Sequence, residues 1–248
     1  RKLGRLPAVY NKLTPKLARY MSVEKTPEVP SVDYTSHVKI PFGMMMNDQI
    51  GCCTLSAIGH LVMGYSSYNE KDIMLQMMTD EEIKTYYKIL GGWDPNDVST
   101  DNGCVMINVL NYWMTQGIRC GTILNKIYGY SYLDPKDIVL LRYALYEFGG
   151  LYIGINLPEY CEDHTKWEIT DNMGKILGGH CVTLQGVDDN NNLTSISWGE
   201  KMTITPEFLA TYCDECYVLH NEHFVNPQGL DFNRLKADLD KLRKNQFV

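Results

Sequence analysis

Residues 47–57 read Asn-Asp-Gln-Ile-Gly-Cys-Cys-Thr-Leu-Ser-Ala, and this stretch is the most informative in the chain. A glycine-bearing loop leads directly into a predicted helix. The apolar residues that would form its buried side are Leu55, Ile58, Val62 and Met63. Cys53 then falls in the first helical turn, where unpaired N–H groups and the helix dipole favour a thiolate, the nucleophile of acyl transfer. The same pattern is equally consistent with a small buried hydrophobic residue at a helix start.

A second informative segment is Gly178-Gly179-His180-Cys181-Val182-Thr183-Leu184. His180 begins a predicted strand directly after two glycines, where another group can approach its ring closely. An imidazole beside a thiol takes the thiol proton and later protonates the leaving group. The alternative is a histidine with a purely structural role.

Length and composition exclude several classes of protein. A chain of 248 residues, 44% of them hydrophobic, suits a globular domain of one or two lobes. No stretch approaches 18 consecutive apolar residues, so we predict no membrane partner. The net charge of −7 argues against general nucleic-acid binding. Eight cysteines are too sparse for a disulfide scaffold, so reduced thiols are the simpler expectation, although one or two bridges remain open.

The N-terminal segment is strongly basic. Residues 1–23 contain six Lys or Arg and no acidic residue. One interpretation is a solvated, partly disordered terminus. The other is a basic arm that lies on another subunit, on nucleic acid or on an acidic surface. We predict an arm and linker over residues 1–30, a domain over 31–225 and a C-terminal helix over 226–248.

The order of the predicted elements indicates an α+β chain. Helices are expected in the front half: from Cys53, over 79–89 behind a Thr79/Glu82 capping box, over 105–116, and over 134–148 behind Asp134-Pro135. Strands are expected at 151–157, 180–187, 193–198 and 201–204, before a last helix capped by Asp231. This order predicts a helical front lobe and an antiparallel β back lobe with a cleft between them.

Taken together, the segments resemble a known family. Cys53 lies 127 residues before His180, and Ser197-Trp198-Gly199 follows. In order and spacing, residues 32–220 resemble the papain-like cysteine peptidases. The pattern is also similar to uncharacterised proteins of bacteria and their phages.

The resemblance implies a two-lobed papain-like fold and a role for particular residues. It implies that Cys53 is the nucleophile and His180 its base. Asn47 stands six residues before Cys53, where the family has a glutamine, and its amide would stabilise the oxyanion. The substrate-binding residues that it implies are Gly103, in the segment Asp101–Cys104 that resembles a wall of the cleft, and Gly179 and Trp198.

A further position departs from the family. Where the family has the asparagine that orients the histidine, this chain has Ile196, which cannot bond to an imidazole. A Cys-His dyad remains, with Asp188 and Asp189 as candidate orienting groups by their nearness in sequence. Loss of an orienting partner weakens catalysis without abolishing it, and it also fits an inactive descendant of the fold.

Metal and cofactor sites are not predicted. Cys213-x-x-Cys216 near His220 and His223 makes zinc conceivable, but packing of these cysteines in the core is the preferred interpretation. His60, two helical turns beyond Cys53, is too far along the helix to act on that thiol. The chain shows no P-loop, dinucleotide-binding fingerprint or H-E-x-x-H motif.

The sequence therefore predicts a thiol hydrolase that cleaves peptide or amide bonds of a peptide or protein substrate through an acyl-enzyme. The alternative is a catalytically inactive papain-like structural or binding protein, such as a phage virion component attached through residues 1–23. Nucleic acid would be a partner only through that basic arm. Residues 1–248 show no signal peptide, so a cytoplasmic or virion location is expected rather than secretion.

Overall fold

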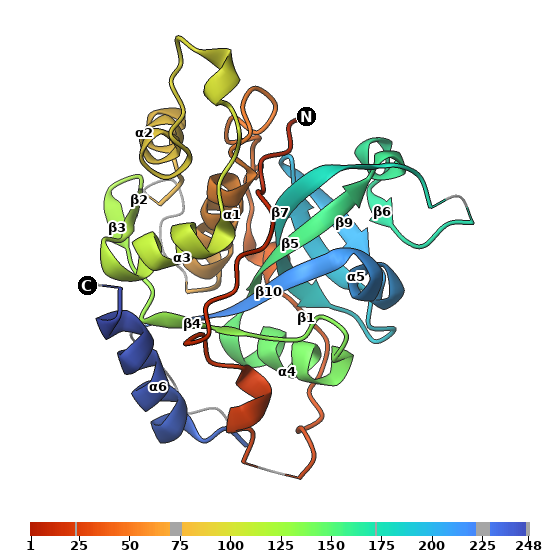
Figure 1. Ribbon diagram of the computed structural model, residues 1–248. Coiled ribbons are helices and arrows are strands. Elements are labelled where there is room, and N and C mark those ends of the chain that lie inside the picture. Colours follow the sequence, from red (N-terminus) through yellow and green to blue (C-terminus); the bar gives the residue numbers. More distant parts are fainter. Residues whose placement is uncertain (23, 70–75, 172, 222–228, 247–248) are drawn as a thin grey trace.

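The computed structural model describes residues 1–248 except 23, 70–75, 172, 222–228 and 247–248. Its helices lie mostly in the first 150 residues and its strands mostly after them (Figure 1). The helices are α1 (Cys53–Tyr68), α2 (Asp80–Gly91), α3 (Met106–Thr115), α4 (Ile138–Phe148), α5 (Pro206–Tyr212) and α6 (Phe232–Lys244), with short 3-10 turns that include η1 (Leu17–Tyr20) and η2 (Tyr34–His37). The predicted α+β order is confirmed.

Local sequence signals set most helix ends. The Thr79 hydroxyl accepts the Glu82 N–H, and the Glu82 carboxylate accepts the Thr79 N–H, so the predicted capping box opens α2. The prediction for α4 was wrong by a few residues. Its cap is Asp137, which accepts the Leu140 N–H, whereas Asp134 accepts the Lys136 N–H in the turn before it.

The strands form one large sheet in the order β4-β10-β5-β7-β8-β9-β6, antiparallel except for the β6–β9 pair. β1 adds to the side of β7, and β2 and β3 form a separate hairpin. The strands β5 and β7 to β9 confirm the predicted antiparallel region, whereas β4 and β10 were not predicted. The bounds are β1 (Val32–Asp33), β2 (Ile118–Cys120), β3 (Ile123–Asn125), β4 (Gly129–Tyr132), β5 (Leu151–Pro158), β6 (Lys166–Trp167), β7 (Ile176–Val187), β8 (Leu193–Ser197), β9 (Glu200–Ile204) and β10 (Cys213–His220).

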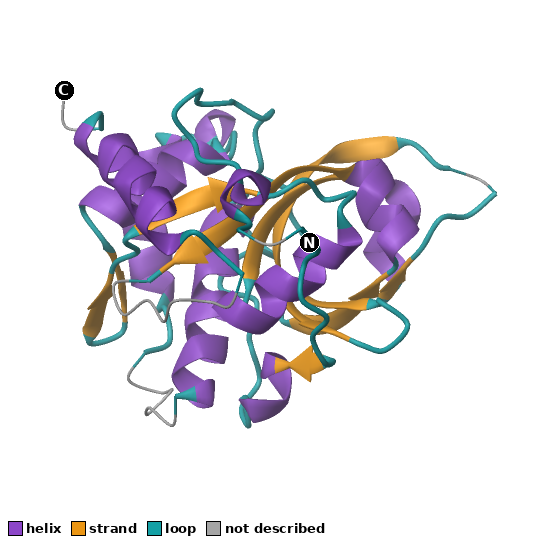
Figure 2. Cartoon of the chain, turned by 90° about the horizontal axis from the view of Figure 1, so that it is seen from below, coloured by secondary structure: helices purple, strands orange, loops and turns teal. Residues whose placement is uncertain are grey.

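Both faces of the central strands are buried. Along β5, Leu151, Ile153 and Ile155 belong to one hydrophobic cluster, with α4 and α5. Tyr152 belongs to the other, with α1 and α3. Successive strand residues point to opposite faces of a sheet, so the two clusters lie on opposite faces. Helices accordingly cover the curved sheet on both sides (Figure 2). Among the described helices, none combines the length and hydrophobicity that a membrane crossing requires.

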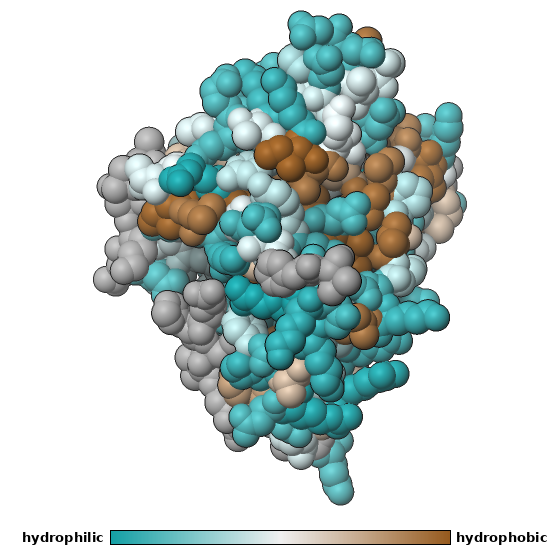
Figure 3. Space-filling view, turned by 60° about the vertical axis from the view of Figure 1, so that its left-hand side comes forward, coloured by the Kyte–Doolittle hydropathy of each residue, from teal (hydrophilic) through white to brown (hydrophobic). Residues whose placement is uncertain are grey.

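Helix α6 is amphipathic and packs beside β4. Leu235, Leu239 and Leu242 are buried, and the charged residues of the helix lie on its other side. The surface over this helix is accordingly hydrophilic (lower part of Figure 3). The predicted last helix is therefore present, behind an Asp231 side chain that accepts the Arg234 N–H.

Candidate active site

Cys53 is the first residue of α1 and is buried against β7. The backbone N–H of Cys181 donates to its Sγ at 3.4 Å. This contact exists because β8 pairs with β7 only from Thr183 onward, which leaves the preceding stretch of that β7 edge without a neighbouring strand. The N–H of Cys181 and the carbonyl of Gly179 point to this open edge, since residues two apart in a strand point the same way.

His180 lies in β7 and is buried. Its Nε2 is hydrogen-bonded to Ser197 Oγ at 2.8 Å. Its ring stacks on Trp198, with centroids 4.4 Å apart and planes inclined by 16°. Its Nδ1 is buried and has no hydrogen-bond partner among the described residues. One ring nitrogen is thus held in place while the other remains available.

The orienting group of His180 differs from those predicted. Asp188 caps the turn after β7 by accepting the Asn190 and Asn192 N–H groups, and Asp189 is bonded to Ser31. Both lie beyond the far end of β7, so the prediction that they orient His180 was wrong. Ile196 pairs with Thr183 across the sheet. Sequence reasoning missed Ser197, although it adjoins Trp198 in the segment that carries the resemblance.

Asn47 is buried in the loop before α1. Its Nδ2 donates to the carbonyl oxygens of Lys2 at 3.1 Å and Ile50 at 3.3 Å. The side-chain amide is therefore already placed as a donor to a carbonyl oxygen from another segment. That oxygen belongs to the N-terminal segment of the same chain.

Residues 2–6 form a segment that runs between the two halves of the molecule, with α1 and α3 on one side and β7, β5 and β10 on the other (Figure 1). Arg5 N–H donates to the Gly179 carbonyl at 3.0 Å. On the opposite side, Cys104 N–H donates to the Gly4 carbonyl at 2.8 Å, and Leu6 N–H donates to the Cys104 carbonyl at 3.0 Å. Residues 2–6 are therefore held in place by these contacts and do not form the solvated terminus that one interpretation expected.

Glycines permit this close approach. A Cβ on Gly4 would lie 1.7 Å from the Gly51 carbonyl oxygen. A Cβ on Gly103 would lie 2.2 Å from the Gly4 oxygen, and one on Gly179 would lie 2.2 Å from the Arg5 oxygen. Trp198 Nε1 donates to the Lys2 carbonyl at 3.2 Å. The residues predicted to bind substrate thus surround this segment, while their action on a substrate stays a prediction.

The side chains of Cys53 and His180 are both neutral in this arrangement. Burial raises the pKa of Cys53 to about 12, although the backbone amides of Cys181 and Gly4 act in the opposite direction. Burial, together with the charges of Arg5 and Arg1, lowers the pKa of His180 to about 3. The thiolate that the helix start favours is therefore absent here, because desolvation outweighs the helix dipole.

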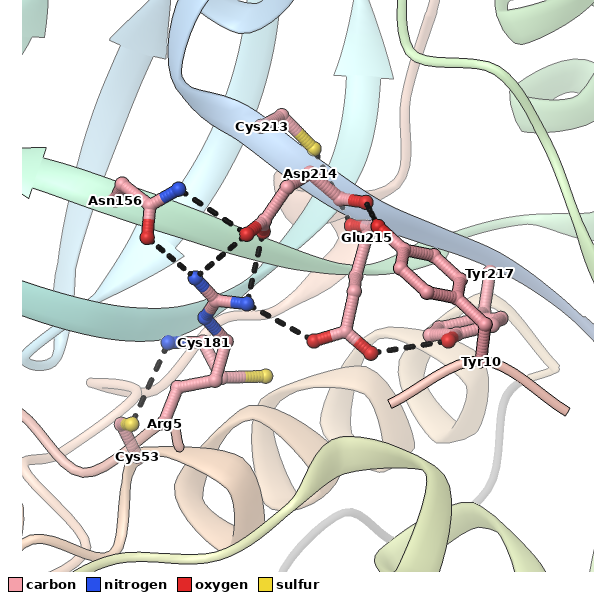
Figure 4. A network of polar contacts seen from close by, with 9 residues as sticks. All are labelled: Arg5, Tyr10, Cys53, Asn156, Cys181, Cys213, Asp214, Glu215 and Tyr217. Atoms are coloured by element: carbon pink, nitrogen blue, oxygen red, sulfur yellow. Dashed lines mark hydrogen bonds and ion pairs between the residues drawn. The ribbon is translucent and has the colours of Figure 1, made fainter. Parts of the chain in front are cut away.

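Arg5 carries the strongest ionic contact of the segment (Figure 4). Its Nη1 lies 2.8 Å from Asp214 Oδ1 and 2.9 Å from Glu215 Oε2. Its Nη2 donates to Asn156 Oδ1 at 2.8 Å. Burial opposes its charge, but Asp214 and Glu215 outweigh burial and raise the pKa of Arg5. The guanidinium is thus a buried cation with its counter-charges in place.

The cysteines and histidines outside this site make other contacts. Cys213 and Cys216 are buried in β10, and His220 is hydrogen-bonded to Ser131. His60 is hydrogen-bonded to the Gly43 carbonyl. No group of three His, Cys, Asp or Glu side chains within the described residues is arranged to hold a metal ion. His223, part of the zinc alternative, lies outside the described residues.

Comparison with known proteins finds similarity in structure only. No family model and no curated protein matches the sequence. Xylellain, a cysteine protease from Xylella fastidiosa, is similar with a TM-score of 0.68 at 15% identity, over 89% of this chain and 97% of its own. Digestive procathepsin L 3 of the Tenebrio molitor larval midgut gives 0.57 at 13% identity, over 84% and 76%. The bromelain protease of Ananas comosus, in complex with an inhibitor, gives 0.56 at 13%, over 79% and 100%.

These similarities confirm the predicted fold. The chain has the two-lobed α+β fold of the papain-like cysteine proteases, in a strongly divergent sequence. They do not bear on the roles of individual residues, and the predicted virion or assembly partner finds no support in them.

Proposed function

We propose that this papain-like fold carries a thiol hydrolase of peptide or amide bonds, here in a latent state that residues 2–6, the inhibitory segment, maintain. The observation that carries the proposal is that the two ring nitrogens of His180 have different surroundings. Its Nε2 is fixed by Ser197, and its Nδ1 remains free, on a strand whose next residue contacts the Cys53 sulfur. An imidazole with one nitrogen oriented and the other available is the arrangement that a general base requires.

The mechanism follows from these positions. With the cleft open, His180 Nδ1 takes the proton of the Cys53 thiol, and the thiolate attacks the carbonyl carbon of the substrate. The oxyanion accepts hydrogen bonds from Asn47 Nδ2 and the Cys53 N–H. The tetrahedral intermediate expels the amine, which receives the proton from His180. Water, activated by His180, then hydrolyses the thioester and returns the free thiol.

The inhibitory segment fits the cleft without being in position for cleavage. The carbonyl that reaches the Asn47 amide is that of Lys2, whereas the backbone amide that acts on the sulfur belongs to Gly4. The group in the oxyanion position and the group at the nucleophile therefore come from different peptide units. The neutral thiol and neutral imidazole further lower the reactivity of this state.

The test displaces the segment within the full chain. In Gly4→Val the new side chain would overlap the Gly51 carbonyl, so residues 2–6 must lift from the cleft. Ala18→Val adds two methyl groups at an exposed position of the same N-terminal region and is the matched control. Each variant is treated with a peptide epoxide, and the modified cysteine is identified by mass spectrometry. We expect labelling of Cys53 to accelerate at least about tenfold in Gly4→Val and to stay unchanged in Ala18→Val.

A second readout separates exposure from activation. The rate of alkylation of Cys53 by iodoacetamide is measured against pH in Gly4→Val, with and without His180→Ala. An activated thiol reacts well below pH 7, whereas an ordinary exposed thiol reacts as its pKa near 8.5 is approached. Alkylation that follows the ordinary profile whether or not His180 is present would contradict the proposal.

That negative result is what the alternative function predicts. A catalytically inactive binding protein would expose Cys53 on displacement of the segment without activating it. Ile196, at the position of the family's asparagine, is the feature that keeps this alternative open. Attachment to a virion or other assembly through residues 1–23 stays a prediction, and deletion of that segment with a partner-binding assay would test it.

A further inference from the structure

We infer that Asp214, Glu215 and Asn156 form a specificity pocket for an arginine side chain of the substrate, and that Arg5 occupies it in the latent state. The inference rests on the proposed function and adds a substrate class to it. Figure 4 shows the guanidinium directed at these three side chains, which come from β10 and β5.

The pocket lies beside the reactive groups. Arg5 follows Gly4, whose backbone amide acts on the Cys53 sulfur, and Arg5 N–H is bonded to the carbonyl next to His180. Cys181, whose N–H contacts Cys53, stands at the wall of the pocket (Figure 4). A side chain that enters the pocket therefore belongs to the residue adjacent to the one that covers the thiol.

The shape of the pocket depends on a missing side chain. A Cβ at position 154 would lie 2.7 Å from Arg5 Cδ and 2.7 Å from Met106 Sδ. Gly154 thus leaves the room that the aliphatic part of the arginine fills. The strand residues on either side, Ile153 and Ile155, face the opposite cluster and do not restrict the pocket.

The pocket is built to hold its acceptors in place when they bind a cation. Glu215 has a fully buried side chain, and its Oε1 accepts the Tyr217 hydroxyl at 3.0 Å. Asn156 Nδ2 donates to Asp214 Oδ2 at 3.1 Å, which turns the amide oxygen towards the guanidinium. Asp214 is partly exposed, with 33% of its side chain accessible, and Asn156 is half-buried.

The charge balance selects a cation. Two carboxylates face one guanidinium, so the pocket remains favourable to positive charge even when Arg5 occupies it. An apolar side chain would leave the buried Glu215 without a counter-charge, which is strongly unfavourable. Arginine is favoured over lysine because its two terminal nitrogens reach Glu215 and Asn156 together, whereas an ammonium is a single point charge.

The main experiment uses the full-length Gly4→Val chain and peptide vinyl sulfones that differ only in the residue adjacent to the electrophilic one. That residue is arginine, citrulline or leucine, and citrulline keeps the shape of arginine without its charge. We expect the arginine probe to label Cys53 at least about 30-fold faster than the citrulline probe. Glu215→Gln should reduce this ratio to below about threefold, and the exposed Glu81→Gln should leave the ratio unchanged.

A second experiment does not depend on catalysis. In full-length Arg5→Ala the pocket is empty, and ethylguanidinium should raise the melting temperature whereas neutral ethylurea should not. Glu215→Gln in the same chain should abolish the difference. Equal rates for all three probes together with no guanidinium effect would overturn the pocket. Guanidinium stabilisation without any labelling of Cys53 would instead leave the pocket in place and contradict the hydrolase.

Discussion

The proposed reactive pair and the proposed specificity pocket are both buried by the same five residues, yet they respond to burial in opposite ways. Within the part of the chain that the structure describes, Cys53 and His180 have no ion-pair partner, and desolvation holds both in their neutral forms. Arg5 has its carboxylates within 2.9 Å and stays charged. Burial alone thus does not decide the ionisation of a site; the presence of an opposite charge in contact does. In the proposed function, the same segment therefore covers the nucleophile and supplies the cation of the pocket.

The largest effect is expected from removal of the proposed nucleophile. In the Gly4→Val chain, Cys53→Ala should lower turnover of a fluorogenic arginine-containing peptide at least about 10³-fold, because no covalent intermediate forms. Cys52→Ala, next to it and also buried, should keep most of the activity. Turnover that survives Cys53→Ala would assign any activity to another group.

Acidification should weaken the binding of the inhibitory segment in the cleft. With the segment in place the pKa of His180 is about 3, below its ordinary value of 6.5, chiefly because of burial. The open cleft therefore binds the proton more tightly, and lowering the pH from 6.5 towards 3 favours opening by up to about tenfold per pH unit. Hydrogen exchange at the Arg5 and Leu6 amides, corrected for intrinsic rates, should show this loss of protection.

His180→Gln is the control for that pH effect, because glutamine has no proton to gain in this range. The protection of the Arg5 and Leu6 amides should then depend less on pH. An unchanged pH dependence would attribute the opening to protonation of the pocket carboxylates. It would contradict the prediction that proton uptake by His180 drives the opening.

Loss of the hydrogen bond between His180 and Ser197 should have a smaller effect on the rate of Cys53 labelling. In the Gly4→Val chain, Ser197→Ala removes the only described partner of Nε2, and Cys53 labelling should fall about tenfold as the ring loses its orientation. Ser195→Ala is a matched control two residues earlier in β8, since its buried Oγ has no hydrogen-bond partner among the described residues. Equal effects of the two substitutions would mean that Ser197 does not position the base.

The smallest effect is expected far from the cleft. Thr79→Ala removes the cap of α2 and should lower the free energy of unfolding by about 1 kcal/mol, as measured by urea denaturation. Labelling of Cys53 in the Gly4→Val chain should not change. A parallel loss of labelling would show that the cleft responds to general stability rather than to its own contacts.

Local patterns predicted the elements that depend on neighbouring residues. The capping box of α2, the start of α1 at Cys53 and the alternating strands after residue 150 all follow from spacing within a few positions. β10 was missed because nearly all of its residues are buried, so the strand shows no alternation of buried and exposed positions. The start of α4 was misplaced because two aspartates offered a cap and only the folded turn selects between them.

Local patterns were enough to predict the fold, because helix starts, glycines and strand alternation are encoded by neighbouring residues. The same patterns singled out Cys53 and His180, whose reactivity stays a prediction. Only the tertiary structure decided what surrounds them. It brought Ser197 to His180 and placed Arg5 against Glu215, contacts between residues 17 and 210 positions apart. It also decided the charge state of Cys53, since desolvation depends on what the rest of the chain packs over the thiol. No pattern along the chain contains that information.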